Sequence, residues 1–171
     1  MNTLIIYGSQ YGTTKRYAEK FAKMTHFPVV NYENVKTLTD YERIIYFGAL
    51  YAGGVKGLKN TVKKLSPNTK LIIVTVGLAD VCDLENISNI RNSIRKQVPE
   101  HLLKAASVFH LRGGIDYSKL NFKHRTMMKM LYHSLKSKST ESLTQEDKAF
   151  IETYNKKVNF VDYDSLKRIA I

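Results

Sequence analysis

Apolar runs and helical stripes alternate along the chain. A parallel strand covered on both faces has a nearly continuous apolar run rather than strict polar and apolar alternation. Four segments read this way: Thr3 to Tyr7, Ile44 to Phe47, Leu71 to Val76 and Ser107 to Leu111. A weaker run over 29–32 predicts an edge strand. The pattern therefore predicts a five-stranded parallel sheet.

Between these runs, apolar residues recur every three or four positions, as on one face of a helix. The three sets are Tyr17, Ala18, Phe21 and Met24; Val55, Leu58, Val62 and Leu65; and Leu84, Ile87, Ile90, Ile94 and Val98. Residues 144–147, Thr-Gln-Glu-Asp, resemble a capping box and predict a last helix whose inward residues are Phe150, Ile151, Tyr154 and Val158. Strands alternating with helices predict a doubly wound α/β sheet, order 2-1-3-4-5, in one domain over 1–171.

The first strand is followed by a loop that is typical of a phosphate cradle. Here a strand ends, small and hydroxyl residues follow, and a helix begins, so backbone N–H groups and the positive end of the helix dipole converge. The candidate phosphate-binding residues are Ser9, Gln10, Tyr11, Gly12, Thr13 and Thr14. The alternative is a plain strand-to-helix turn in which Thr13 or Thr14 only caps the helix.

Two more loops are expected beside this one, because ligands of doubly wound sheets bind beyond the carboxyl ends of the strands at the switch point. Their candidate ligand-binding residues are Ala49, Leu50, Tyr51, Ala52 and Gly53, and then Gly77, Leu78, Ala79 and Asp80. Small residues let backbone amides approach the polar edge of a flat aromatic ligand, and Tyr51 offers a ring for stacking. A turn with a surface tyrosine remains the alternative for Tyr51.

Several other site chemistries fit poorly. The glycine patterns of nucleotide triphosphatases and of dinucleotide-binding loops are absent, and a phosphoacceptor receiver domain would need an aspartate where Gly48 follows the third strand. The spacing of the histidines, without a carboxylate cluster, argues against a metal site. The single cysteine, Cys82, allows no internal disulfide and is expected to be a small apolar filler.

The charge points to an anionic partner. Lys and Arg number 27 against 15 acidic residues, a net charge of +12. The excess is concentrated in a connection over 112–143, which is far longer than usual and is expected to be a basic helical insertion before the last helix. Within it, Met127, Met128, Leu131 and Leu135 share one face of an expected helix. That face could lie in a lipid interface, line a site for an apolar anionic molecule or pack on the domain; nucleic acid fits less well.

The loop at 9–14, with Ala18 four residues on, resembles the FMN phosphate loop of the flavodoxins. Residues 112–117, Arg-Gly-Gly-Ile-Asp-Tyr, followed by the basic, methionine-rich segment, are similar to the menaquinone-dependent protoporphyrinogen dehydrogenases. This resemblance implies an FMN-dependent oxidoreductase of heme biosynthesis that oxidises protoporphyrinogen IX with a quinone as acceptor. It also implies peripheral membrane contact, for which we expect residues 119–138. No side chain stands out for proton transfer.

Two alternatives use the same fold. One is a basic flavodoxin that carries electrons between protein partners, and the other is a lipid-bound adaptor without flavin. The chain has no apolar run of about 18 residues and no basic and hydrophobic leader before its first strand. From this we expect a cytoplasmic protein, with the insertion contacting the inner face of the membrane.

Overall fold

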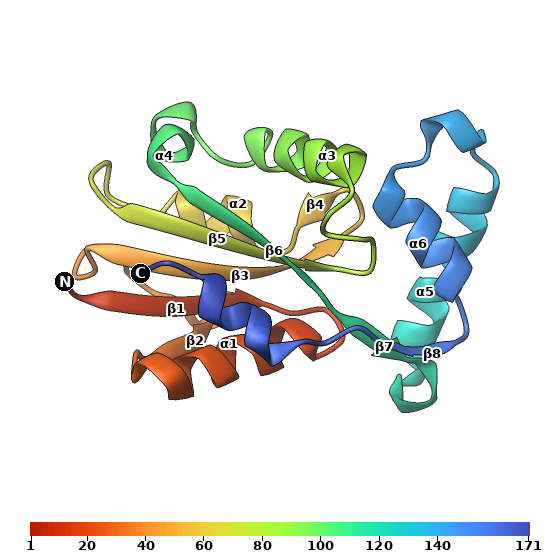
Figure 1. The fold of residues 1–171 in the computed structure, drawn as a ribbon, viewed down its shortest axis with the longest axis horizontal. Coiled ribbons are helices and arrows are strands. Elements are labelled where there is room, and N and C mark those ends of the chain that lie inside the picture. Colours follow the sequence, from red (N-terminus) through yellow and green to blue (C-terminus); the bar gives the residue numbers. More distant parts are fainter.

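A parallel sheet forms the centre of the molecule, as the computed structural model of residues 1–171 shows (Figure 1). Its strand order is β2-β1-β3-β5-β6. The bounds are β1 Thr3–Gly8, β2 Val29–Asn31, β3 Arg43–Tyr51, β5 Lys70–Gly77 and β6 Ser107–Arg112. A short β4, Gly54–Val55, folds back antiparallel on the end of β3. Since β4 only extends β3, the five main strands confirm the predicted order 2-1-3-4-5.

Helices cover both faces of this sheet. In Figure 1, α1 lies below the sheet, and α2, α3 and α4 lie above it. Ile5, Ile45 and Ile72 are in register on neighbouring strands and pack with α1, whereas the adjacent positions Ile6 and Tyr46 pack with the helices on the opposite face. Because side chains alternate across a strand, each run of consecutive apolar residues supplies two cores. The bounds are α1 Thr13–Thr25, α2 Leu58–Val62, α3 Leu84–Arg95 and α4 Glu100–Ala105.

The predictions of the helices were less accurate than those of the strands. Helix α2 is only five residues long, because Val55 belongs to β4 and the helix ends at Val62. Helix α3 forms where predicted, but Leu84 at its first position is 81% exposed and lies outside the core. Helix α4 was not predicted. Cys82, expected to be a core filler, is exposed in the turn before α3, so that interpretation was wrong.

Beyond the carboxyl ends of the strands lies a separate group of elements, which we call the appended unit, residues 113–162 (Figure 1). It contains β7 Gly114–Asp116, α5 Phe122–Lys136, α6 Gln145–Thr153 and β8 Lys157–Asn159, with β7 and β8 paired antiparallel. Its own small core consists of Ile115, Tyr117, Met128, Leu135 and Phe150. Single-turn 3-10 helices are η1 Tyr32–Asn34, η2 Tyr117–Lys119, η3 Thr140–Ser142 and the longer η4 Tyr163–Arg168.

The predicted last helix is present but packs elsewhere. The Thr144 hydroxyl accepts a hydrogen bond from the Asp147 amide at 3.1 Å, and the Asp147 carboxylate accepts one from the Thr144 amide at 3.0 Å, which confirms the capping box. Helix α6 then packs on α5 rather than on the sheet, and Val158 belongs to β8. Leu166 of η4, together with Ile169, completes the core beside α1 instead. The insertion is therefore longer than 112–143 and includes α6.

Candidate functional site

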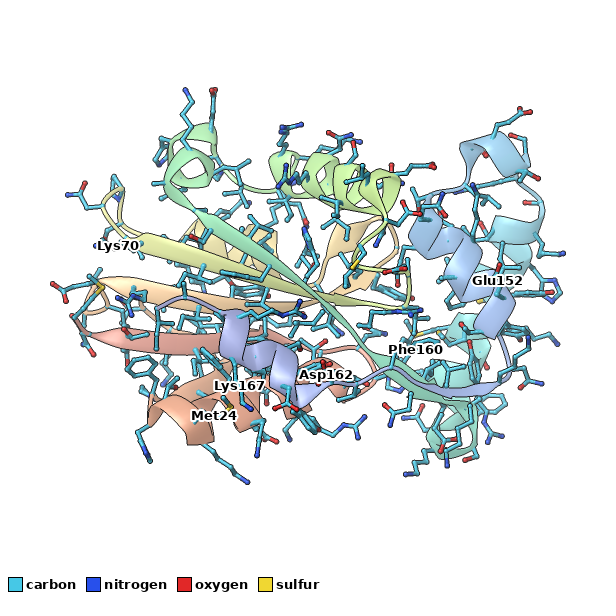
Figure 2. The ribbon with its side chains drawn as sticks, in the orientation of Figure 1. Met24, Lys70, Glu152, Phe160, Asp162 and Lys167 are labelled. Carbon is cyan, nitrogen blue, oxygen red and sulfur yellow. The ribbon has the colours of Figure 1, made fainter.

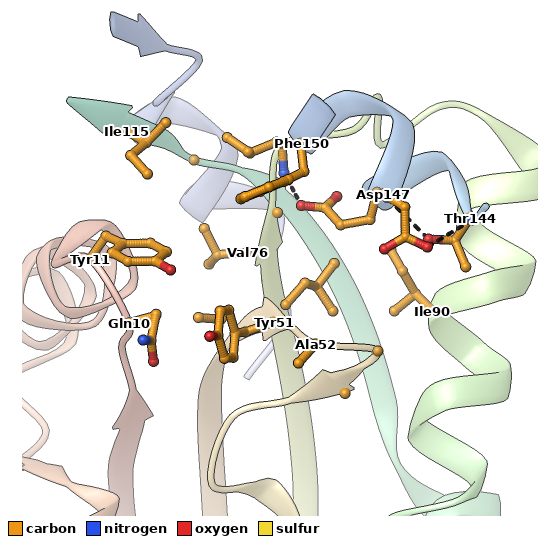
Figure 3. A pocket seen from close by; sticks show the side chains of 18 of the residues that line it. Gln10, Tyr11, Tyr51, Ala52, Val76, Ile90, Ile115, Thr144, Asp147 and Phe150 are labelled. Atoms are coloured by element: carbon orange, nitrogen blue, oxygen red, sulfur yellow. Dashed lines mark hydrogen bonds between the residues drawn. The ribbon is translucent and has the colours of Figure 1, made fainter. Parts of the chain in front are cut away.

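The three predicted loops meet in one pocket at the carboxyl ends of β1, β3 and β5. Figure 3 shows Gln10 and Tyr11 on one side, Tyr51 and Ala52 below, and Val76 at the end of β5. Eleven of the predicted site residues line this pocket: Gln10, Tyr11, Thr13, Thr14, Ala49, Leu50, Tyr51, Ala52, Gly53, Gly77 and Leu78. The sequence therefore located the ligand-sized cavity of this fold, although contact with a cofactor remains a prediction for each of these residues.

The loop after β1 leaves donors free for an anion. Gly12 is the N-cap residue of α1, with a left-handed φ of 92° and no side-chain cap. The Ser9 hydroxyl accepts a hydrogen bond from the Gly12 amide at 3.0 Å, which closes the turn. Thr13 donates its hydroxyl to the Gly114 carbonyl at 2.9 Å, whereas Thr14 lines the pocket. The first amides of an uncapped helix lack partners in the helix, so they can bind a phosphate.

A lysine that the sequence analysis did not single out stands next to this loop. The Lys56 ammonium donates a hydrogen bond to the Gln10 side-chain oxygen at 2.5 Å. Gly8 allows this approach, because a Cβ there would lie 2.2 Å from the Lys56 carbonyl oxygen. The lysine follows β4, and only the reversal of the chain after β3 brings it back to the first loop. It adds a positive charge at the Gln10 end of this loop, although Lys56 does not itself line the pocket.

Tyr11 joins the first loop to the appended unit. Its ring is edge-on to Tyr51, with centroids 6.3 Å apart, and edge-on to His124 of α5, with centroids 6.0 Å apart. Its hydroxyl contacts the Met128 sulfur. Burial raises the pKa of Tyr11, so the phenol stays protonated at physiological pH. The side chain is therefore a neutral packing contact that holds α5 against the loop.

The loop after β5 is held on both sides. The Glu146 carboxylate of α6 accepts hydrogen bonds from the Leu78 and Ala79 amides, at 2.7 and 2.9 Å. From the other side, the Arg112 guanidinium donates two hydrogen bonds to the Leu78 carbonyl, at 3.0 and 2.7 Å. Glu146 lines the pocket. The sequence analysis included it only as part of the capping-box segment 144–147, because no local pattern marks it as a site residue. The amides expected at the edge of an aromatic ligand thus already have an acceptor.

Four predicted residues do not line the pocket: Ser9, Gly12, Ala79 and Asp80. The first two shape the turn before α1, and Ala79 is buried, with its amide donating to the pocket-lining Glu146. Asp80 is exposed, and its carboxylate accepts a hydrogen bond from the Cys82 amide at 2.8 Å. It therefore stabilises a turn outside the pocket. Its position after β5 in the sequence does not distinguish a ligand-binding residue from a turn residue.

The appended unit supplies the apolar wall. Met128, Leu131 and Leu135 of α5 and Phe150 of α6 line the pocket opposite the strand ends. Figure 3 shows Phe150 facing Val76 across the cavity. Of the uses considered for the methionine and leucine face, it both packs on the domain and lines a site. Met127, predicted on the same face, neither lines the pocket nor joins this small core, and membrane contact through residues 119–138 stays a prediction.

A flavodoxin domain model matches residues 4–142 of the sequence. The chain belongs to the flavodoxin domain family. A search of the curated proteins finds no match. Solved structures similar to this flavodoxin-domain protein include a flavoprotein in complex with FMN from Lactobacillus acidophilus NCFM, 14% identical, with a TM-score of 0.45, covering 65% of this chain and 91% of that one. Another is a mutant flavodoxin from Pseudomonas aeruginosa, 16% identical, with a TM-score of 0.39, covering 78% of this chain and 96% of that one.

Family membership supports FMN as the cofactor, and the residues of this flavodoxin domain fit it. Four buried side-chain polar atoms have no partner in the protein, and two of them are the Asn86 side-chain oxygen and the Asn89 side-chain nitrogen. Both asparagines are on α3 and line the pocket. Buried polar atoms are rarely left unpaired, so one acceptor and one donor are available at the end of the pocket formed by α3. Together with the uncapped start of α1, they suit a ligand with a phosphate and a polar ring.

Proposed function

We propose that the protein binds FMN in this pocket and acts as a flavin-dependent redox protein. The observation that carries the proposal is the convergence of the uncapped helix α1, the β3 loop and the β5 loop on one cavity. The amides at the start of α1 and the Thr14 hydroxyl would hold the phosphate, with the charge of Lys56 nearby on the Gln10 side chain. Bound FMN would supply the electron-transfer chemistry, and the protein would bind it and exclude water.

For the reaction, we propose oxidation of a porphyrinogen-type substrate, protoporphyrinogen IX in the first instance, with a quinone as electron acceptor. The support is the wall of Met128, Leu131, Leu135 and Phe150, which covers the strand ends with apolar side chains. Such an apolar wall suits a flat apolar small molecule as the reactant better than it suits the polar surface of a protein partner. The net charge of +12 suits a substrate with carboxylate substituents.

An electron carrier between proteins is an equal candidate, because the same basic surface suits an acidic protein partner. The two functions differ in the reactant that reaches the flavin. An oxidoreductase would turn over porphyrinogen with a quinone and no second protein. A carrier would exchange electrons rapidly with a small redox protein, with a rate that falls as salt is added, and would leave porphyrinogen unchanged.

The first experiment measures FMN and riboflavin binding by quenching of flavin fluorescence. Thr14→Val removes the hydroxyl of a residue that lines the pocket, and this hydroxyl makes no hydrogen bond within the protein. We expect FMN to bind roughly tenfold more weakly, because a hydrogen bond to a charged group is lost. Riboflavin lacks the phosphate and should bind with unchanged affinity.

Thr37→Val is the matched control, since Thr37 is exposed and hydrogen-bonds only to Thr39. It should bind both flavins as the unaltered protein does. Absence of FMN binding by the folded, unaltered protein would refute the cofactor assignment. An equal loss of FMN and riboflavin affinity in Thr14→Val would refute the location of the phosphate.

A further inference from the structure

Glu146 places a carboxylate inside the pocket from an element outside the sheet. It is the second residue of α6, and both its oxygens accept hydrogen bonds from consecutive amides of the β5 loop, at 2.7 Å from Leu78 and 2.9 Å from Ala79. The contact links residues 68 and 67 positions apart in the sequence. A planar pair of acceptor atoms therefore already occupies two adjacent donors in the proposed flavin site.

The loop is built to receive this carboxylate. A Cβ at Gly77 would lie 2.7 Å from a Glu146 oxygen and 2.7 Å from a Leu50 methyl carbon, so a larger residue would obstruct the contact. The Arg112 guanidinium holds the Leu78 carbonyl, and the Gly77 carbonyl accepts a hydrogen bond from the Gly113 amide at 2.7 Å. The peptide that presents the two amides is thus fixed, whereas Glu146 belongs to a unit with a much smaller core.

We propose that Glu146 is an internal competitor of the ligand, which must leave the Leu78 and Ala79 amides before a flavin ring can use them. This inference rests on the proposed FMN function. A ligand with two neighbouring acceptor atoms on a planar edge, as a flavin ring has, replaces the carboxylate. Displacement of Glu146 moves α6 and, through the shared core with α5, the apolar wall of the pocket. The apparent affinity for FMN is the intrinsic affinity multiplied by the fraction of molecules in which Glu146 is displaced.

The charges around Glu146 give the competition a pH dependence. Burial raises the pKa of Glu146, and Asp147 on the same helix adds to this, while hydrogen bonds from Ala79 and Leu78 and the charge of Arg112 on β6 oppose it. On α3, Glu85 accepts a hydrogen bond from the neighbouring Gln145. The residues of α5 that line the pocket are uncharged, and Tyr11 and Tyr51 line its far side.

The direction follows from linkage. A displaced Glu146 is in water, where its pKa is ordinary, so the bound form of the side chain holds a proton more tightly than the displaced form. Acid therefore favours the closed contact, and rising pH favours displacement with release of a proton. Competition with FMN should be strongest at low pH and should weaken as the pH rises.

The test compares Glu146→Ala with Glu152→Ala, which removes the same charge from an exposed position on the same helix (Figure 2). FMN affinity is measured from pH 5 to pH 8 by fluorescence quenching. We expect Glu146→Ala to bind FMN roughly three- to tenfold more tightly than the unaltered protein at neutral pH. The ratio should increase toward pH 5. Taking the ratio cancels the titration of the FMN phosphate, and Glu152→Ala should match the unaltered protein.

A second measurement needs no flavin. Amide hydrogen exchange of Leu78 and Ala79, followed by NMR in the ligand-free protein, should be faster in Glu146→Ala and unchanged in Glu152→Ala. Equal or weaker FMN binding by Glu146→Ala overturns the competition, and weaker binding would make Glu146 part of the ligand site. If no variant binds FMN, the proposed function and the competition for FMN both fail. Protection of the two amides by Glu146 would then still stand as a separate result.

Discussion

The sheet and the appended unit hold the two sides of the pocket in different ways. The sheet lies between two cores of 15 and 13 buried residues, whereas the appended unit has a core of five and a two-stranded ribbon of three-residue strands. Since buried apolar area supplies most of the stability of a domain, the two regions should differ in local stability. The Leu78 and Ala79 amides therefore belong to the region with the larger cores, whereas Glu146, which binds them, belongs to the region with the smaller core.

The largest effect is expected from the middle of the sheet. Ile73 of β5 is fully buried between neighbouring strands and the helices above them. Ile73→Ala should lower the free energy of unfolding by about 2–5 kcal/mol, because it removes buried methyl groups and leaves a cavity. Urea denaturation measures this change. Ile87→Ala on α3, where the side chain is partly exposed, is the milder reference and should cost less; equal losses would mean that this core is not the main source of stability.

The matched change in the appended unit is Met128→Ala, at a residue only 1% exposed. By itself such a substitution also costs roughly 2–5 kcal/mol of local packing. Because the core around Met128 has only five buried residues, we expect the loss to appear chiefly as faster amide exchange over 114–159. The amides of β1, β3 and β5 should keep their protection. Uniformly faster exchange in both regions would show that the sheet and the appended unit unfold as one.

The same difference separates what the sequence predicts from what it does not. The strand runs and the phosphate loop are local patterns, so β1, β5 and the turn around Gly12 could be derived from neighbouring residues. The Thr144 capping box is also local and was correctly predicted. The contact of Glu146 with the Leu78 amide depends on how a distant unit docks, and no periodicity encodes that.

Position alone misled the interpretation in other places. Asp80 follows β5 as a ligand-binding residue would, but its side chain turns outward to cap the next turn. Lys56 reaches the first loop only because β4 reverses the chain. Met128, Leu131 and Leu135 of the predicted face of α5 do lie together, whereas Met127 does not join them, and the helical period did not indicate what this face packs against. Periodicity identifies a buried face, and only tertiary structure supplies its partner.

A smaller effect, with a sign opposite to that of Glu146, is expected from His110 on β6. Burial, and then the charge of Arg91, lowers the pKa of His110, whose Nδ1 lies 2.7 Å from the Thr75 hydroxyl. The unfolded chain therefore binds a proton more readily than the folded one. Stability is fully present above the unfolded pKa of about 6.5 and is lost as the pH falls through the folded value. Acid should thus weaken the sheet while it favours the Glu146 contact.

Urea denaturation at pH 7 and pH 5 measures the His110 contribution. His110→Gln should reduce the loss of stability on acidification, whereas His101→Gln, at an exposed position of α4, should leave it unchanged. An undiminished pH dependence in His110→Gln would assign the acid sensitivity to other groups.

The smallest effect on stability is expected on the outer face of α5, which we propose as a contact with anionic lipid. Phe122 is 86% exposed and Met130 is 69% exposed, and Lys123 and Lys129 beside them form no ion pair. Helical geometry places these residues opposite the face that lines the pocket. Exposed apolar side chains among lysines suit a surface of anionic headgroups.

Phe122→Ser should change the free energy of unfolding by no more than about 0.5 kcal/mol. It should nevertheless reduce cosedimentation with phosphatidylserine-containing vesicles by roughly tenfold, since a buried phenyl side chain contributes about 1.5–3 kcal/mol. Leu84→Ser is the matched control, because Leu84 is 81% exposed but belongs to α3 rather than to α5. Vesicle binding that is equal in the two variants would refute the contact. Loss confined to Phe122→Ser would assign vesicle contact to the outer face of α5, the helix whose opposite face lines the pocket.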